Sequence, residues 1–143
     1  MIAVNKTEIS FPSNSVNEGF ARGTVSAFLA QLDPTLADLT DMKTAVSEAV
    51  TNAIVHGYKD KMGIVYITIK IFENNKATVK VRDKGCGIPD IKTAMEPLFT
   101  TGGEERAGLG FAVMQSFCDS VRVTSAANRG TSITLTKFFE KKE

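Results

Sequence analysis

A glutamate and an asparagine four residues apart, Glu48 and Asn52, are the first side chains whose types and spacing suit chemistry. In a helix this spacing stacks both side chains on one face. A carboxylate can accept a proton from an attacking hydroxyl, and an amide oxygen is a ligand that Mg²⁺ prefers. Polar residues opposite an apolar stripe usually face solvent, however, so the helix alone leaves both interpretations open.

A second acidic residue, Asp83, ends a predicted strand and shares the inward parity of Val79 and Val81. A carboxylate aimed at the core costs free energy unless a group donates to it. The donor is either the backbone or the exocyclic amine of a ligand. Gly85 and Gly87 follow at once, and glycines let a backbone approach a flat ligand closely. By itself this Gly-x-Gly pattern is a weak signal.

The last predicted strand supplies a hydroxyl, because Thr131 shares the parity of Ile133 and Leu135. A threonine on a core face is commonly structural. Taken together, Asp83 and Thr131 fit the polar edge of a purine.

A glycine-rich segment at 99–110 precedes a predicted helix, whose free N–H groups would suit a phosphate. Arg106 lies just before Gly108 and Gly110 and could pair with that phosphate. No Gly-Lys-Ser/Thr follows, so the segment is not a Walker A loop, and its position argues against a Rossmann site. A lid that orders on nucleotide fits it better.

The elements that must position these residues are predicted to be a first strand, two helices, a β-hairpin, one further helix and two closing strands. Helices are predicted from Ser13 or Asn14 to about Leu32, with Phe20, Val25, Phe28 and Leu29 facing the core, then past Asp33-Pro34 to Gly57, and over Gly108–Phe117. Strands are predicted at 3–11, 64–73, 76–83, 121–125 and 131–138. The alternation predicts an α+β fold: one domain over 1–143, a two-layer α/β sandwich with a mostly antiparallel mixed sheet.

Composition bounds the function. Hydrophobic residues make up 43% and the formal net charge is +1, so we expect neither a nucleic-acid nor a membrane partner. Neither an apolar run of about 20 residues nor a signal peptide is expected. Cys86 and Cys118 match no zinc spacing, so we expect free thiols and a cytoplasmic location.

Four motifs in order carry a family resemblance. They are Glu48-Ala-Val-Thr-Asn52-Ala-Ile-Val-His56-Gly57, Asp83-Lys-Gly85-Cys-Gly87-Ile88-Pro89, Gly108-Leu-Gly110-Phe111 and Gly130-Thr131. The chain resembles the histidine-kinase-type ATPases with the Bergerat (GHKL) fold. Thr24–Pro34 and Pro97–Thr101 are similar to the branch of serine-protein kinases that act as anti-sigma factors in sporulating bacteria.

The resemblance implies a role for each matching residue. Glu48 would be the general base and Asn52 would hold Mg²⁺ against the phosphates of ATP or ADP. Asp83, with Thr131 nearby, would bind the adenine amine in the cradle of Gly85 and Gly87. Arg106, Gly108 and Gly110 would serve the lid and phosphates. Arg22 matches an arginine that in this family meets both protein partners.

The implied function is an anti-sigma factor and serine/threonine-protein kinase that regulates sporulation. It would be a homodimer that binds an RNA polymerase sigma factor with ATP and phosphorylates an anti-anti-sigma factor on serine. Two alternatives stay open: a stress-response kinase of the same family, and a non-catalytic nucleotide-gated binding module. The segment between Thr101 and Gly108 departs from the family by being shorter, and Cys86 and Lys84 replace a small apolar and an acidic residue.

Overall fold

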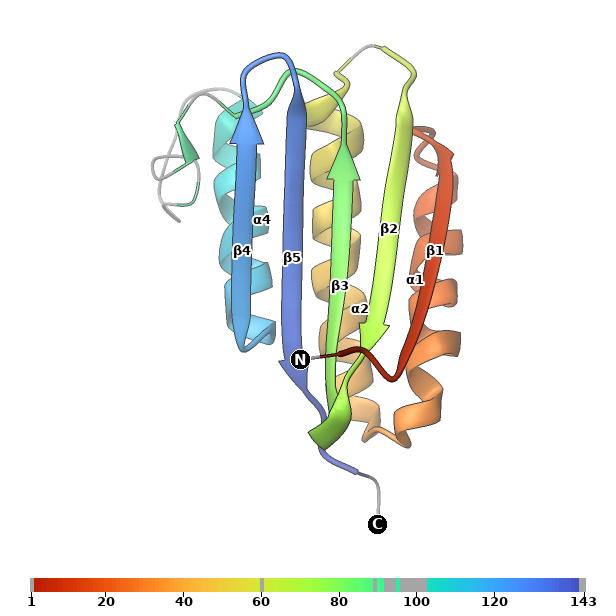
Figure 1. The fold of residues 1–143 in the computed structure, drawn as a ribbon. Helices are drawn as coiled ribbons and strands as arrows, with labels where there is room; N and C mark the ends of the chain where they lie inside the picture. Colours follow the sequence, from red (N-terminus) through yellow and green to blue (C-terminus); the bar gives the residue numbers. More distant parts are fainter. Residues whose placement is uncertain (1, 60, 89, 92–94, 96–102, 142–143) are drawn as a thin grey trace.

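The computed structural model describes residues 2–59, 61–88, 90–91, 95 and 103–141, and for 103–108 the backbone alone. Five strands form one sheet in the order β1-β2-β3-β5-β4 (Figure 1). The strands are β1 (Asn5–Pro12), β2 (Ile64–Ile71), β3 (Lys76–Asp83), β4 (Ser120–Ala126) and β5 (Gly130–Phe138). All four pairings are antiparallel, so no parallel pair occurs among the described strands and the mixed component of the prediction is not observed.

The helices all cover one face of this sheet and leave the other face open (Figure 1). They are α1 (Asn17–Leu29), α2 (Leu36–Thr51) and α4 (Gly103–Phe117), with a six-residue π-helix, η2 (Asn52–Gly57), continuing α2. Short 3-10 turns, η1 (Ala30–Leu32) and η3 (Glu73–Asn75), follow α1 and β2. The predicted α+β two-layer fold is therefore confirmed.

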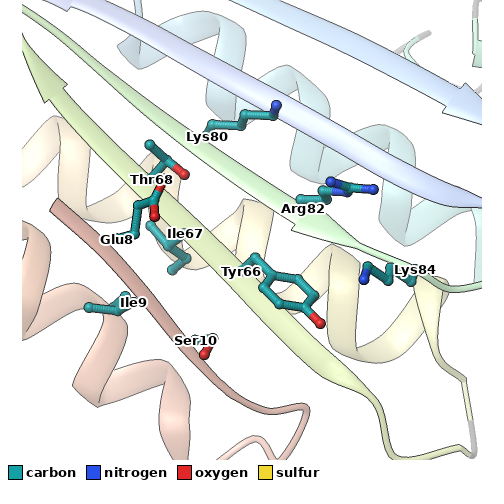
Figure 2. Close-up of a pocket in the computed structure, with 9 residues that line it drawn as sticks. All are labelled: Glu8, Ile9, Ser10, Tyr66, Ile67, Thr68, Lys80, Arg82 and Lys84. Atoms are coloured by element: carbon teal, nitrogen blue, oxygen red, sulfur yellow. The ribbon is translucent and has the colours of Figure 1, made fainter. Parts of the chain in front are cut away.

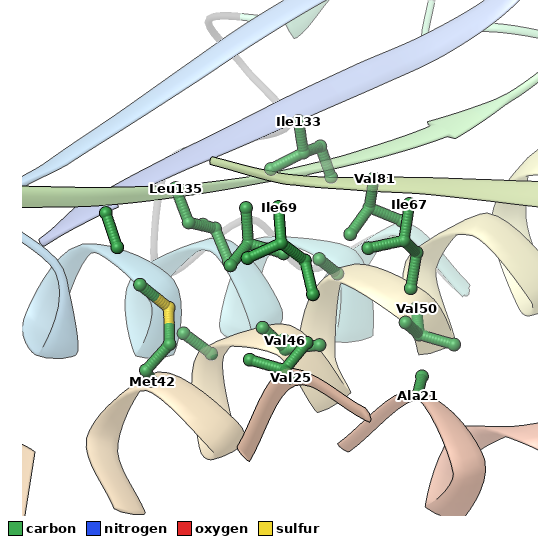
Figure 3. Close-up of a cluster of buried hydrophobic side chains, with 14 of the residues drawn as sticks. Ala21, Val25, Met42, Val46, Val50, Ile67, Ile69, Val81, Ile133 and Leu135 are labelled. Carbon is green, nitrogen blue, oxygen red and sulfur yellow. The ribbon is translucent and has the colours of Figure 1, made fainter. Parts of the chain in front are cut away.

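The core lies between the helices and the inner face of the sheet (Figure 3). Strict alternation in β2 and β3 creates it, because every second residue of these strands is buried. The labelled members are Ala21, Val25, Met42, Val46, Val50, Ile67, Ile69, Val81, Ile133 and Leu135. Burial of this apolar area is the main favourable contribution to stability and fixes how α2 lies on β3 and β5.

Two predictions about the first helix were wrong. The helix begins at Asn17 rather than next to Ser13 or Asn14, because both side chains bond elsewhere. Ser13 Oγ accepts the Gly63 N–H at 2.9 Å, and Asn14 Oδ1 accepts the Val16 N–H at 3.0 Å. Phe20, predicted to face the core, is 54% exposed and makes a T-shaped contact with the Phe11 ring.

The last helix begins at Gly103, five residues before its predicted start at Gly108. Arg106 therefore lies inside α4 and not ahead of it, and Gly108 and Gly110 are helical residues. The second helix was predicted correctly: Thr35 Oγ1 caps it by accepting the Asp38 N–H at 3.2 Å, and the helical stretch ends at Gly57.

Candidate functional site

The predicted base, Glu48, lies where α2 packs against α4. Its side chain is half-buried. A Cβ at Gly110 would lie only 3.1 Å from Glu48 Oε2, so the missing side chain makes room for the carboxylate between the two helices. The structure thus brings together two predicted site residues that lie far apart in the sequence.

Asn52 is the first residue of the π-helix, one turn beyond Glu48. The Tyr58 N–H donates to Ala53 O at 3.0 Å, five residues back, which widens the helix at this point. Such π turns are frequent at functional sites. Asn52 is 7% exposed, and its Oδ1 atom has no hydrogen-bond partner among the described residues. A buried oxygen without a donor fits a hard cation such as Mg²⁺, which takes few protein ligands and keeps waters and phosphates.

Asp83 is 3% exposed at the end of β3. Burial raises the pKa of its carboxyl above the ordinary value, while hydrogen bonds from the Gly85 and Thr131 backbones lower it. The Gly85 N–H donates to Asp83 Oδ1 at 2.9 Å. A Cβ at Gly57 would lie 2.7 Å from the same carboxylate, so the end of η2 closes on Asp83 through a residue without a side chain.

Three hydrogen bonds made by backbone groups hold the turn after Asp83 in place. The Cys86 N–H donates to Gly57 O at 2.9 Å, and the Asn128 N–H donates to Cys86 O at 2.7 Å. The Lys84 N–H donates to the Tyr58 hydroxyl at 2.7 Å. This turn is therefore held in place without a ligand, as a preformed binding site requires.

Thr131, 5% exposed, sits beside Asp83 because the two are Cα partners in the β3–β5 ladder. On its other side Thr131 is the partner of Ser125 in β4. Gly130, just before it, has φ +105°, and a side chain there would collide with the Asp83 backbone. The two residues predicted to read a purine edge are thus neighbours on the inner face of the sheet.

Sequence reasoning missed Ser125. Its hydroxyl accepts the Ile88 N–H at 2.7 Å and lies 2.9 Å from Thr131 Oγ1. The signal was available, since Ser125 shares the parity of Val121 and Val123, which pack against the core.

The remaining predicted residues are placed less completely. Arg106 and Gly108 lie in α4, and their side-chain surroundings fall outside the described part of the chain. The lid was predicted in the segment 99–110, and residues 96–102 also lie outside the described part of the chain.

Arg22 is exposed on α1, outside the pocket, and its guanidinium lies 3.3 Å from Glu18 Oε1. The other Glu18 oxygen accepts from Thr51 Oγ1 at 3.2 Å. Thr51 immediately precedes Asn52, so a single carboxylate joins Arg22 to the helix that carries the predicted site.

A hollow of about 540 Å³ lies on the opposite, open face of the sheet (Figure 2). Its polar side chains come from β1, β2 and the end of β3 and include Glu8, Tyr66, Lys80, Arg82 and Lys84. None of the predicted site residues lines it. The candidate site is instead the inner end of β3 and β5 together with η2 and α4.

Both cysteines are free, as predicted. Burial is the main reason that the pKa of Cys118 rises to about 11, so this thiol is inert at neutral pH. Within the described ranges no three His, Cys, Asp or Glu side chains gather as a metal cluster. A helix with the length and hydropathy to cross a bilayer is also absent from those ranges.

Comparison with known proteins defines the class first. The family model for the histidine kinase-like ATPase domain matches residues 11–137, a span that contains Glu48, Asn52, Asp83 and Thr131. A domain of this kind implies nucleotide binding.

Relatives with high sequence identity define the subfamily. The chain is 57% identical to the anti-sigma F factor of Thermoanaerobacter sp. (strain X514) over 136 residues, covering 94% of each chain. It is 52% identical to that of Geobacillus stearothermophilus, covering 97% of this chain and 96% of the relative. The chain therefore belongs to the anti-sigma F factors of the histidine kinase-like ATPase family.

Solved structures agree on the fold. The RsbU and RsbW domains of a Mycobacterium tuberculosis protein match 97% of this chain and 34% of theirs, with a TM-score of 0.71 at 19% identity. The histidine kinase domain of the Erythrobacter litoralis EL346 blue-light activated kinase covers 85% of this chain and 61% of its own, with a TM-score of 0.56 at 18% identity.

Proposed function

We propose that this chain is an anti-sigma factor with serine-protein kinase activity. In the ATP-bound form it holds a sporulation sigma factor of the sigma-F type inactive, and it phosphorylates an anti-anti-sigma factor on serine. The position of Glu48 is the main support for the kinase activity. Its carboxylate lies beside Gly110, one turn before the Asn52 oxygen that has no hydrogen-bond partner among the described residues.

Glu48 acts as the general base of the transfer. The proton of the substrate serine hydroxyl moves to a Glu48 carboxylate oxygen, and the serine oxygen forms a bond to the γ-phosphorus. The bond between that phosphorus and the leaving ADP oxygen breaks. Phosphoryl transfer depends mainly on such positioning and on charge stabilisation.

The nucleotide is held by the remaining residues. Asp83 accepts from the adenine amine, with Thr131 beside it, and the turn of Gly85 and Gly87 lies against the ring. Asn52 Oδ1 would hold Mg²⁺, which would neutralise charge on the phosphates. Arg106, Gly108 and Gly110 complete the phosphate end of the site from α4.

Similarity to the anti-sigma F factors supports a sigma factor as one partner of this chain. Arg22 on α1 is the proposed contact for both the sigma factor and the substrate. Its exposure supports this role, and its link through Glu18 to Thr51 gives a bound partner a route to the nucleotide helix. Because the proposed partner is a sigma factor of RNA polymerase, we propose a cytoplasmic location.

We also propose a homodimer. β1 is an edge strand of the sheet, and edge strands offer unpaired backbone groups to another chain. Beside it, Val16 just before α1 (74% exposed) and Phe20 within α1 (54% exposed) form an apolar pair suited to an interface. A sedimentation mass equal to one chain at all micromolar concentrations would contradict this assembly.

The test of the kinase is transfer of the γ-phosphate to a purified anti-anti-sigma protein by wild type and Glu48→Gln. We expect Glu48→Gln to lose at least about a hundredfold of the rate, as removal of a general base does, and to keep ADP affinity. Glu73→Gln, an exposed glutamate in η3, is the matched control and should transfer normally.

Two other outcomes are informative. Equal transfer by wild type and Glu48→Gln would remove Glu48 from the mechanism. Tight ADP binding without any transfer would instead identify a nucleotide-gated binding module. Capture of a stress-response sigma factor in place of a sporulation one would assign the same chemistry to a different switch.

A further inference from the structure

The open face of the sheet, which the helices leave uncovered, carries an uneven share of the charge (Figure 1). On the five strands its outward-facing charged side chains are basic except for one, Glu8, although the whole chain has 17 Lys and Arg against 16 Asp and Glu. The basic members are Lys6, Lys70, Lys76, Lys80, Arg82 and Arg122. The open face is therefore basic, and the rest of the molecule carries the excess of acid.

Three cations form a row along β3 and just beyond its end. Lys80, Arg82 and Lys84 are all exposed and alternate along the chain, so they follow one another at intervals of about 7 Å. Within the described ranges no ion pair joins any of them to an acid. The Lys84 ammonium lies over the Tyr66 ring, 4.9 Å from its centroid. The positive charge of this row is therefore left for a partner.

The row forms one wall of the hollow of about 540 Å³ (Figure 2). Tyr66 and Thr68 of β2 lie between this wall and β1, which contributes Glu8 and Ser10. The Glu8 carboxylate pairs with Lys6 at 3.0 Å and not with the cations of β3. The hollow thus has a cationic wall along β3 and a single negative charge in the wall facing it.

An extended peptide matches this arrangement. Its side chains alternate between two sides, and those on one side recur every about 7 Å, the interval of the cations on β3. Acidic side chains at every second residue would meet the cationic wall, and a basic side chain between two of them would meet Glu8. A nucleic-acid backbone or an anionic membrane presents negative charge alone, which Glu8 repels. The charge pattern therefore favours a protein segment.

We propose that this hollow is a docking site for an extended acidic segment of a partner protein. The segment places acidic side chains at every second residue against Lys80, Arg82 and Lys84, and a basic side chain on its other side against Glu8. The inference goes beyond the proposed function and does not depend on it, because the hollow and the candidate nucleotide site lie on opposite faces of the sheet.

Two capped heptapeptides of identical composition test the charge spacing. Ser-Glu-Ser-Glu-Lys-Glu-Ser carries the alternating pattern, and Ser-Lys-Glu-Glu-Glu-Ser-Ser turns one acid toward Glu8. Each is titrated into ¹⁵N-labelled protein, and amide chemical shifts give both the place and the affinity of binding. We expect shifts along β1, β2 and β3, and at least about threefold tighter binding of the alternating peptide, since exposed ion pairs contribute modestly. Raising the salt from about 0.05 M to about 0.5 M should weaken binding.

Matched variants locate the contact. Arg82→Glu reverses the charge at the centre of the row and should weaken the alternating peptide at least about fivefold. Lys141→Glu makes the same change of charge at an exposed lysine outside this face and should bind like wild type. Glu8→Gln should narrow the preference between the two peptides. Lys80→Gln, a milder change, should weaken binding in the same direction and replaces Arg82→Glu if that variant does not fold.

Several results would overturn the proposal. Absence of shifts on this face with either peptide at millimolar concentration would do so, as would equal affinity for the two peptides. Shifts there with a 20-base-pair DNA duplex or with phosphatidylglycerol vesicles, but not with the alternating peptide, would assign the face to a phosphate-bearing partner. Shifts on this face that depend on protein concentration without any peptide would assign it to a second copy of the chain.

Discussion

Asp83 carries a carboxylate that is almost fully buried. Its pKa is raised by burial, so folding favours the protonated form. Its contribution to stability is therefore complete below the unfolded pKa of 3.8 and is lost as pH rises through the higher folded pKa. At neutral pH the carboxylate is charged, and the hydrogen bonds from the Gly85 and Thr131 backbones offset only part of the cost of its burial.

Asp83→Asn should separate stability from binding. We expect the free energy of unfolding of the nucleotide-free protein to rise at pH 7, with a smaller difference from wild type near pH 4. ADP affinity should fall about 10- to 100-fold, because a hydrogen bond to a charged group is lost. Urea unfolding at both pH values and calorimetry with ADP measure this. A variant less stable than wild type at pH 7 would show that the two backbone donors outweigh burial.

At this scale the alternation rule predicted Asp83 and Thr131 correctly as inward-facing, and both are buried. The same rule also predicts that Ser125 faces inward. Its role was missed because the hydrogen-bond partners of a serine in a strand are known only from the structure. The rule for helices failed at Phe20, since a periodic pattern does not say how far the sheet extends beneath a helix.

Among the elements, the contact between α2 and α4 decides where the proposed base sits. Gly110 is the point of contact, and a side chain there would press on the end of Glu48. The sequence motif predicted that Gly110 belongs to the site but assigned it to the phosphates. The structure adds a second function, room for the Glu48 carboxylate, which only the packing of two distant helices reveals.

Gly110→Ala tests this contact. The added methyl group should displace the Glu48 carboxylate by a few tenths of an ångström and lower phosphotransfer about tenfold. ADP affinity should stay within about twofold, and stability should change by less than about 1 kcal/mol, since alanine favours a helix. Gly23→Ala on α1, where a Cβ meets nothing within 4 Å, is the matched control and should transfer normally. Equal rates for both variants would show that Glu48 tolerates the crowding.

The π turn at Asn52 could not be predicted, because the apolar spacing of α2 continues unchanged and Gly57 marks the same end for an α-helix or a π-helix. The strand pairs were easier. The turn at Asn74 and Asn75 predicted the β2–β3 hairpin, whereas the pairing of β3 with β5 joins distant segments and follows from no local signal.

In the whole molecule the helices cover one face of the sheet. The candidate site lies between these two layers and not on the open face. A nucleotide bound at the proposed site would therefore contact α2, η2, β3 and β5 together. A ligand that binds only the folded state stabilises it by mass action.

ADP at 100 times its dissociation constant should raise the free energy of unfolding by about 2.7 kcal/mol. Glu48→Gln should gain as much as wild type under the same ratio, because the base is not required for binding. Chemical unfolding with and without ADP measures the gain. A gain for wild type without one for Glu48→Gln would place Glu48 in nucleotide binding.

The pairing of β3 with β5 determines how the chain could be divided into two fragments that reassemble. Each hairpin, β2–β3 and β4–β5, is continuous in sequence, and β3–β5 is the only strand pairing between them in the described sheet. Asp83 and Thr131, the pair proposed to bind adenine, lie at the end of that ladder. Two fragments divided between Asp83 and Gly103 would each keep one hairpin and one residue of this pair. If the pair binds nucleotide, reassembly of the fragments should depend on nucleotide and report its concentration.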